Sequence, residues 1–426
     1  MALGVAAERS TTTVQAPQKS YTGPMTLMVS LYFGIGFITS LNDILVQHFK
    51  DLFHLSNKGA LLVQFCFFTA YFVMSLPSGG IIGRIGYKRG IVVALSVMGI
   101  GLLLFLPASA VISYPLFLFA LFVVGSGLAL LQVAINPYVG ALGRPETAAS
   151  RINLCGFFNS TATTIAPKLG ATFIFIAVGA TTAQLARSVR MPYLILAICV
   201  FAMAMLVAFV RLPDVIEKGD DSSRSDGGAW RFNHLRLGAL AIFFYVGAEV
   251  AIGSILISFL GQPSMGGLSH NAAATYVSYY WGGAGIGRLI GFFALQKIRA
   301  QRALAFVSLI ASLLVITTLL AHGHVAMWAI VSCGLFNSIM WPCIFPLSID
   351  GLGKFTSQGS GILVTMVVGG AVIPEIQGFL ADRFGYQSSF AIVLLCYVYI
   401  LFFALRGHRN LNAVEVTNSH SPGVIQ

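Results

Sequence analysis

Charged side chains are scarce in this chain. Asp, Glu, Lys and Arg make up 9% of its 426 residues, whereas soluble domains carry about 25%. Hydrophobic residues make up 57%, and the mean hydropathy is +0.85. A water-soluble globule has too little interior to hide so much apolar surface, but helices that cross a bilayer expose apolar faces to lipid. The composition therefore excludes a soluble protein and predicts an all-α membrane protein that has the lipid bilayer as its partner.

Signatures of catalysis and of cofactor binding are also missing. The chain has no nucleotide-binding lysine loop and no metal-ligand spacing, and its six cysteines form no CxxC pair. All six lie within apolar segments, which predicts small buried side chains. The close glycines from Gly282 to Gly287 follow no strand, so they favour helix packing over phosphate binding. We therefore expect no enzyme, no metal and no cofactor, which leaves an ion gradient as the energy source.

The excess of basic residues gives a net charge of +11. Such a charge is typical of nucleic-acid-binding proteins, but here the basic residues lie mostly in polar loops between apolar segments. No nucleic-acid partner is expected. Residues 1–24 lack the apolar core and cleavage pattern of a signal peptide, so the first apolar segment is expected to be retained.

Apolar segments of about 19–25 residues predict twelve membrane-spanning helices. They lie at 26–48, 59–82, 89–110, 114–137, 151–179, 191–211, 236–260, 270–295, 302–321, 324–348, 358–381 and 388–406. The longest polar stretch between them divides the spans into six and six. The predicted organisation is a disordered cytoplasmic tail (1–25), a six-helix bundle (26–211), a cytoplasmic linker (212–235), a second six-helix bundle (236–406) and a cytoplasmic tail (407–426).

Basic residues in the loops predict the orientation, because cytoplasmic loops are enriched in Lys and Arg. With both termini in the cytoplasm, 18 basic residues lie inside and 5 outside, while Lys168 and Arg288 fall within spans. The two halves also show a weak repeat. A shift of 211 residues places Gly36 and Asp43 over Gly247 and Ser254, on the first helix of each half. Two six-helix halves around a central cavity are the arrangement of major facilitator transporters.

Ionisable and amide side chains occur within these apolar segments, where polar groups are costly and therefore suggest function. Asp43 lies in the first segment, and a carboxylate at that depth is stable only if a proton or Na⁺ neutralises it or a cation pairs with it. Two interpretations of Asp43 remain open. In the first it couples transport to a cation, and in the second it forms a structural ion pair with Lys168. Glu249 is a second intramembrane acid, and we predict that it also takes part in cation coupling. For Glu375 we favour an ion pair or a place at a water-filled mouth.

Several segments share the sequence pattern of a known family. They are Leu41–Leu45, Ala70–Pro77, Leu131–Tyr138, Phe244–Val250, Tyr280–Gly283, Gly287–Arg288, Asn337–Pro342, Gly351–Lys354, Gln358–Gly361 and Gly369–Pro374. On these segments the chain resembles the fucose/glucose-galactose symporter family of the major facilitator superfamily. The resemblance extends from the first segment to the last, and it implies cation-coupled uptake of a monosaccharide by alternating access, with Asp43 as the proton acceptor. Fucose symporters carry Glu where this chain has Gln132, and Gln where it has Gly156, so the chain is more similar to the glucose/galactose-type members.

Sugars bind to convergent amides and to aromatic faces that cover their C–H patches. Gln132 is the strongest candidate, because an amide both donates to and accepts from hydroxyl groups. Each of the other amides has a competing role as a hydrogen bond between helices. The candidate substrate-binding residues are Asn42, Gln64, Gln132, Asn136, Asn159, Tyr245, Trp281 and Asn337. For Arg288 we favour a structural or gating charge, and for Pro77–Arg89 and Gly378–Gly385 conformational latches.

These observations predict a multi-pass carrier of the bacterial inner membrane, functional as a monomer, that imports a hexose such as glucose or galactose with H⁺ or Na⁺. Three alternatives remain. A drug/proton antiporter of the same fold would need a large apolar cavity with few amides. A passive sugar uniporter does not need the intramembrane acids. A non-transporting sugar sensor would usually carry an added signalling domain.

Overall fold

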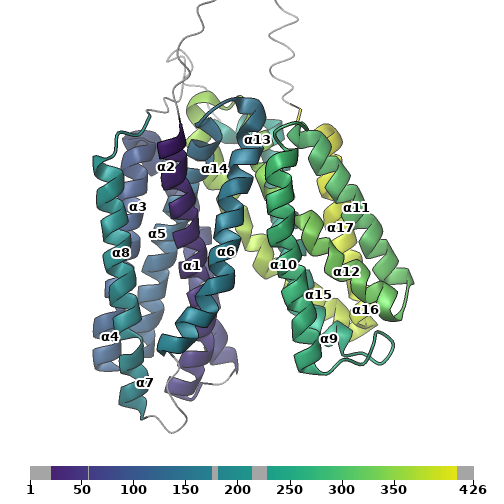
Figure 1. The fold of residues 1–426 in the computed structure, drawn as a ribbon, viewed down its shortest axis with the longest axis horizontal. Helices are drawn as coiled ribbons and strands as arrows, with labels where there is room; N and C mark the ends of the chain where they lie inside the picture. The colour runs from purple at the N-terminus through teal and green to yellow at the C-terminus, as the bar shows by residue number, and fades with distance from the viewer. Residues whose placement is uncertain (1–20, 56, 175–180, 214–227, 410–426) are drawn as a thin grey trace, which may run out of the picture.

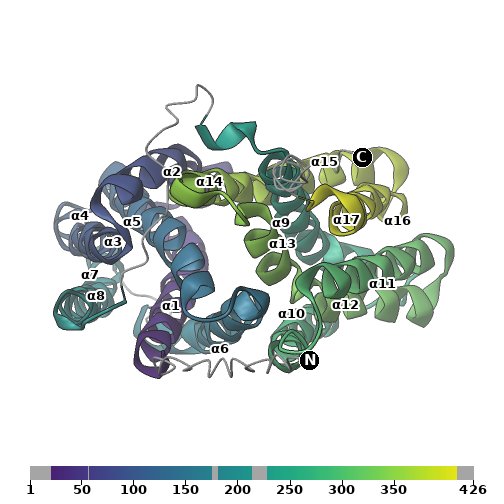
Figure 2. The ribbon, with the colours of Figure 1, turned by 90° about the horizontal axis from the view of Figure 1, so that it is seen from above.

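The computed structural model describes residues 21–55, 57–174, 181–213 and 228–409, and within these ranges the regular structure is helical without strands. The helices form two bundles that lie side by side (Figure 1), and the view from above shows the same arrangement (Figure 2). Residues 1–20 of the predicted tail and most of the predicted linker and C-terminal tail lie outside the described residues, while 22–25 of that tail belong to α1. The first bundle contains α1 (Thr22–Phe53), α2 (Asn57–Ile85), α3 (Tyr87–Leu103), α4 (Phe105–Val111), α5 (Tyr114–Ala141), η1 (Pro145–Thr147), α6 (Ala148–Ile174), α7 (Thr182–Ser188) and α8 (Arg190–Phe209).

The second bundle follows the linker, and several of its spans are divided into shorter helices. It contains η2 (Gly228–Arg231), α9 (Asn233–Leu260), α10 (His270–Ala294), α11 (Ala300–Leu320), α12 (Gly323–Asn337), α13 (Met340–Ile349), η3 (Gly353–Phe355), α14 (Thr356–Thr365), η4 (Met366–Val368), α15 (Gly369–Phe384), α16 (Tyr386–Ser389), α17 (Ala391–Phe402) and the π-helical turn η5 (Phe403–Gly407).

The packing of the first bundle recurs in the second. In the first, α1 packs on α6, α5 packs on both α2 and α3, and α3 packs on α8. In the second, α9 packs on α15, α12 packs on both α10 and α11, and α11 packs on α17. The contacts between bundles repeat in the same way, because α2 meets α14 and α6 meets α10. The faint sequence repeat thus has a structural counterpart in which α1 corresponds to α9.

Two of the breaks within spans precede a proline. α3 and α4 are separated at Leu104, three residues before Pro107, and α12 bends by 41° into α13 before Pro342. Proline has no N–H and cannot bond the carbonyl four residues earlier, so the preceding turn opens. In both cases proline occupies the first turn of the next helix, where its missing N–H costs little.

Nine stretches of the described residues are long and apolar enough to cross a membrane, or ten if α12 and α13 form one bent span. Twelve spans were predicted. The two that are missing from the count of ten correspond to α6 and α10. Both helices have spanning length, with 27 and 25 residues, but they carry more polar residues and glycines. They pack against each other at the junction of the bundles, which is where polar side chains escape lipid. The number twelve stays a prediction.

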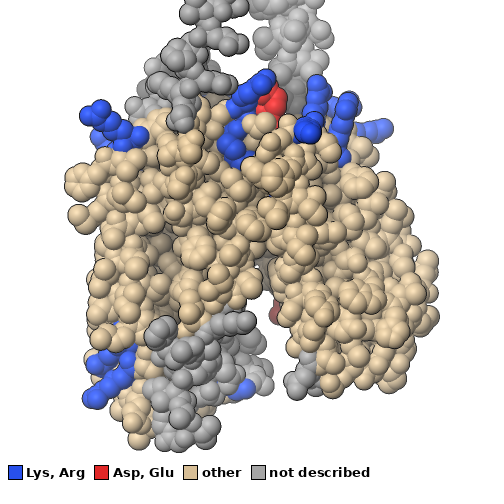
Figure 3. All heavy atoms as spheres, in the orientation of Figure 1, with Lys and Arg blue, Asp and Glu red and all other residues tan. Residues whose placement is uncertain are grey.

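The two bundles meet at one end and separate at the other. Figure 3 shows a hollow between them at the end opposite the one where α1 begins, and the described Lys and Arg gather mainly at the closed end. Of the six cysteines, all without disulfides, four are buried, Cys66 is half-buried and Cys199 is exposed. The expectation that all six are buried was therefore wrong for Cys199, because that side chain lines an open cavity between α1 and α8.

Candidate functional site

A chain of hydrogen bonds links four helices in the core of the first bundle. The Tyr32 hydroxyl on α1 donates to the Asn136 side-chain oxygen on α5, and the Asn136 amide donates to the Gln132 carbonyl at 2.8 Å. The Gln132 side chain donates to the Tyr71 hydroxyl on α2 at 3.1 Å. From α6, the Asn159 amide donates to the Tyr32 carbonyl at 2.9 Å. Three of the predicted amides, Gln132, Asn136 and Asn159, therefore lie in one cluster.

The members of this cluster differ in what they leave available. Asn136 is buried, with both its amide nitrogen and its oxygen engaged. Gln132 is half-buried and uses one N–H, so its oxygen and second N–H have no partner among the described residues. An amide with a free donor and a free acceptor suits a vicinal pair of sugar hydroxyls. Gln132 therefore keeps hydrogen-bonding capacity that Asn136 has already used.

A matching network lies in the second bundle. The Asn337 amide on α12 donates to the Tyr280 hydroxyl on α10 at 2.9 Å, and its oxygen accepts from the Tyr397 hydroxyl on α17 at 2.7 Å. The Tyr280 hydroxyl in turn donates to the Glu249 carbonyl on α9 at 2.9 Å. The two networks match by position. In the first bundle Gln132 on α5 donates to a tyrosine on α2. In the second, Asn337 donates to a tyrosine, and its helix α12 is the counterpart of α5 as α10 is of α2. Asn337 is fully buried with both ends of its amide engaged.

Glu249 is an acid without a full set of partners. Its Oε1 atom is buried and accepts no hydrogen bond from the described residues. Its side chain interacts with Tyr245 on the preceding turn, which also interacts with Arg288. A buried acceptor without a donor is costly, and a bound proton or cation would remove that cost. Tyr245, a predicted substrate-binding residue, and Glu249, a predicted coupling residue, thus both lie close to Arg288.

Arg288 reaches from the second bundle to the first. Its Nη1 donates to the Ser160 hydroxyl on α6, with the Gly156 carbonyl 3.4 Å away. The Asn153 side chain returns a bond from α6 to the Arg288 carbonyl. A Cβ at position 156 would lie 3.5 Å from the Arg288 Cδ, at ordinary van der Waals distance, so Gly156 lies directly beside the Arg288 side chain. The expected gating charge lies at the contact between the bundles.

Glycines close the other inter-bundle contact, between α2 and α14. A Cβ on Gly79 would lie 2.7 Å from the Ser357 carbonyl oxygen, and a Cβ on Gly361 would lie 2.6 Å from the Ser75 carbonyl oxygen. Real Cβ atoms do not approach so closely, so only glycine permits these backbones to touch. Gly79 lies within the predicted latch Pro77–Arg89, which is thus part of the closed end.

The remaining candidates are less completely placed. Trp281 is 45% exposed and packs its ring over Gly253 on α9, and Glu375 on α15 is exposed. The side chains of Asn42, Asp43 and Gln64, and that of Lys168, lie outside the described residues, so only their helices are known. Within the described part of the chain, no three His, Cys, Asp or Glu side chains are grouped to hold a metal.

Sequence reasoning missed Tyr32, Tyr397 and Ser160, which hold the candidate residues in place. A tyrosine in an apolar helix has no spacing rule that distinguishes a hydrogen-bonded hydroxyl from one at the lipid interface. Ser160 is one of several hydroxyl residues on α6, and its partner is 128 positions away. The available signal was the unusual polarity of α6, which marked a helix shielded from lipid.

Known proteins resemble the chain over nearly its full length. The model of the Major Facilitator Superfamily matches residues 28–374. A glucose/galactose transporter of Brucella abortus is 49% identical over 412 residues, which cover 96% of this chain and 100% of the relative. The L-fucose-proton symporter of Escherichia coli is 33% identical over 91% of this chain and 93% of the relative. The crystal structure of the transporter FucP in the outward conformation aligns with a TM-score of 0.83 at 31% identity, covering 91% of this chain and 99% of that one. The repeated bundles, the junction between them and these matches establish that the chain belongs to the Major Facilitator Superfamily.

Proposed function

We propose that the protein is a secondary active transporter that imports a monosaccharide, a hexose such as glucose or galactose, in symport with H⁺ or Na⁺ by alternating access. The observation that carries this proposal is the paired amide–tyrosine networks, one in each bundle, in a chain 49% identical to a glucose/galactose transporter. Each bundle contains such a network, and Figure 3 shows a hollow between the bundles at one end.

Sugar recognition is assigned to the residues that keep unused capacity. Gln132 offers a free donor and acceptor, and Trp281 offers an exposed indole face to the C–H side of a ring. Asn159 is half-buried on the helix that faces the second bundle. Asn136 and Asn337 lie behind these groups with their amides engaged, and in this proposal they set the positions of Gln132 and Tyr280.

Cation coupling is assigned to the intramembrane acids Asp43 and Glu249. Glu249 carries a buried oxygen without a donor, so a proton or Na⁺ at this carboxyl would relieve an unfavourable state. A passive uniporter has no need for such a group, which makes this observation the argument against that alternative. One charge crossing the membrane contributes about 2.3 kcal/mol per 100 mV, enough to concentrate sugar well above its outside level.

The proposed setting is the bacterial inner membrane, with both termini in the cytoplasm and the monomer as the working unit. The gathering of Lys and Arg at the closed end (Figure 3) supports this orientation, because basic residues favour the cytoplasmic side. With the closed end inward, the hollow opens outward. The related FucP structure, which is described as outward, supports the same assignment.

Uptake into proteoliposomes tests the proposal. Purified protein is reconstituted and supplied with radiolabelled glucose, galactose, mannose, fucose or N-acetylglucosamine, under an imposed pH gradient or an imposed Na⁺ gradient. We expect accumulation of glucose or galactose that collapses when the driving gradient is abolished. Uptake that ignores both gradients would instead identify a uniporter, and uptake of none of these sugars would overturn the hexose assignment.

A further inference from the structure

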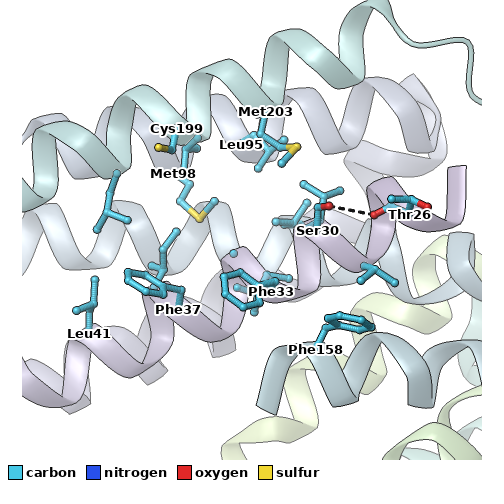
Figure 4. Close-up of a pocket in the computed structure, with 18 of the residues that line it drawn as sticks. Thr26, Ser30, Phe33, Phe37, Leu41, Leu95, Met98, Phe158, Cys199 and Met203 are labelled. Carbon is cyan, nitrogen blue, oxygen red and sulfur yellow. Dashed lines mark hydrogen bonds between the residues drawn. The ribbon is translucent and has the colours of Figure 1, made fainter. Parts of the chain in front are cut away.

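A large cavity in the described part of the chain is lined by the first bundle and not by the junction of the bundles. It has a volume of about 1570 Å³, and every described residue that lines it belongs to the first bundle, between Tyr21 and Met203. α1 forms one wall and α8 the other, with side chains of α3, α5 and α6 between them (Figure 4). We call this cavity the α1–α8 groove. It is separate from the proposed sugar passage.

The groove has an apolar length and one polar end. Phe33, Phe37, Leu41, Met98 and Cys199 line its length (Figure 4). The stretch of α1 from the polar end to Leu41 covers about 30 Å at 1.5 Å per residue, which is about the thickness of the hydrocarbon core of a bilayer. The polar lining comes from Tyr21, Thr22, Thr26, Ser30 and Arg151. A phospholipid extends through one leaflet, which is about half of that thickness, so the part of the channel next to the polar end is complementary to one such amphiphile.

Arg151 gives that end an uncompensated positive charge. Its guanidinium donates to three backbone carbonyls, those of Val139, Gly140 and Arg144, and to the Thr147 hydroxyl. All four acceptors are neutral, and Arg151 forms no ion pair with a described residue; the one described ion pair joins Arg144 to Glu146. A guanidinium has five N–H groups, so one remains available. A phosphate is the natural partner for such a charge.

The walls of the groove come from five helices and are mostly apolar. Flexible acyl chains adapt to an irregular cavity, and methionines such as Met98 and Met203 allow the walls to adjust as well. The position of the groove within membrane-spanning helices makes lipid the neighbouring solvent.

We propose that the α1–α8 groove holds one anionic membrane phospholipid, with its acyl chains along Phe33 and Phe37 and its phosphate beside Arg151. The lipid fills the space between α1 and α8 in place of protein side chains. Since α1 carries Asp43, the occupant supports the helix that bears the proposed coupling acid. The proposal does not depend on which substrate the protein transports.

Gly34 provides the sharpest test, because it lines the groove and a Cβ there would meet nothing within 4 Å. The variant Gly34→Leu puts side-chain atoms into the groove from a position where the Cβ meets no other atom. Its matched control is Gly282→Leu on α10, where a Cβ also meets nothing and the neighbouring Ile286 is exposed. Each protein is purified in detergent with phosphatidylglycerol or phosphatidylcholine, and bound lipid is counted by native mass spectrometry.

We expect wild type and Gly282→Leu to retain one phosphatidylglycerol, and Gly34→Leu to bind it at least about tenfold more weakly, because several methylene contacts are lost. Retention by Gly34→Leu at the wild-type level would overturn the proposal. Equal retention of phosphatidylcholine and phosphatidylglycerol by the wild type would overturn the assignment of an anionic headgroup.

A second measurement needs no substitution and guards against misfolding of the variant. Cys199 is exposed in the groove, and Cys66 is half-buried on α2 outside it. Phosphatidylglycerol added to delipidated wild type in detergent is expected to slow maleimide labelling of Cys199 several-fold and to leave Cys66 unchanged. Labelling of Cys199 that stays constant, or slows in parallel with that of Cys66, would contradict occupation of the groove.

Discussion

Arg288 on α10 donates a hydrogen bond to the hydroxyl of Ser160 on α6 and so joins the second bundle to the first. The same guanidinium lies near Tyr245 and influences Glu249. One cation therefore faces a neutral hydroxyl in one bundle and an acid with an unsatisfied oxygen in the other. A change in the charge of Glu249 would alter the balance between these two attractions, which gives the proposed cation step a direct route to the inter-bundle contact.

Removal of the Ser160 hydroxyl tests whether this bond holds the observed conformer. A hydrogen bond to a charged group contributes about 1.5–3 kcal/mol, so Ser160→Ala should shift the population away from this conformer by about tenfold or more. Distances between spin labels on α6 and α10 report the shift. The control is Ser278→Ala, whose hydroxyl bonds only to Ala274 on its own helix. Unchanged distances in Ser160→Ala would show that the contact rests on other groups.

Because α2 and α14 approach each other closely, the size of the side chain at position 79 should strongly affect closure of the two bundles. Gly79→Leu would place side-chain atoms against the Ser357 carbonyl oxygen, so the end that is closed here should not close. Spin labels at the ends of α2 and α14 should move apart, and net sugar uptake should fall to a small fraction of wild type. Gly80→Leu is the control, because a Cβ there meets nothing within 4 Å. An unaltered label distance in Gly79→Leu would refute the steric role.

Asp43→Asn separates coupling from binding. The amide has the size of the acid but cannot take up a proton or balance the charge of a cation. We expect gradient-driven accumulation to be lost while exchange of sugar across proteoliposomes continues. Asp43→Glu, which keeps the charge, should retain part of the accumulation. Full accumulation by Asp43→Asn would remove this residue from the coupling role and leave Glu249 as the remaining candidate.

Gln132 and its partner Tyr71 distinguish a ligand from a positioning residue. Gln132→Ala should raise the KM for sugar by about tenfold or more, since one good hydrogen bond or two would be lost. Tyr71→Phe removes only the hydroxyl that receives the Gln132 N–H, and a smaller rise in KM with kcat little changed is expected. Initial rates over a range of sugar concentrations decide the matter. Unchanged kinetics in Gln132→Ala would assign the amide to helix packing.

Replacement of Asn337 is expected to lower the stability of the protein more than its affinity for sugar. Its amide joins Tyr280 and Tyr397 in a fully buried position, so Asn337→Ala would leave two buried hydroxyls without this partner. The expected cost is roughly 2–4 kcal/mol, measured as a lower Tm in detergent. Asn233→Ala is the control, since that exposed side chain accepts only a long bond from Arg236. A wild-type Tm with a raised sugar KM would make Asn337 a ligand after all.

Much of the architecture could be predicted, because the length and hydropathy of a segment identify a membrane-spanning helix. The polar helices α6 and α10 were expected as spans for their length, although they fall below the apolar threshold met by nine others in the described residues. The interruptions were harder to foresee. Pro342 and Pro374 look alike in the sequence, yet the chain bends by 41° before the first, while α15 runs through the second. The neighbouring helices decide this, and they are not local in sequence.

The candidate site was predictable by residue type but not by partner. Intramembrane amides and acids are rare enough to be noticed one by one, and Gln132, Asn136 and Asn159 do lie together. Whether an amide faces the passage or another side chain depends on contacts across more than a hundred residues, as with Tyr32 and Asn136. Hydrophobic periodicity contains no information about such pairs, so ligands and supports could not be told apart.

The touching glycines of α2 and α14 bear on how quickly the carrier can turn over. Backbone surfaces that meet through Gly79 and Gly361 fit by shape, and separating them strips no ion of a partner. A seal of this kind costs little to break and little to remake in each cycle. The free energy released by the cation can then drive the sugar against its concentration gradient, because little of it is needed to separate α2 from α14.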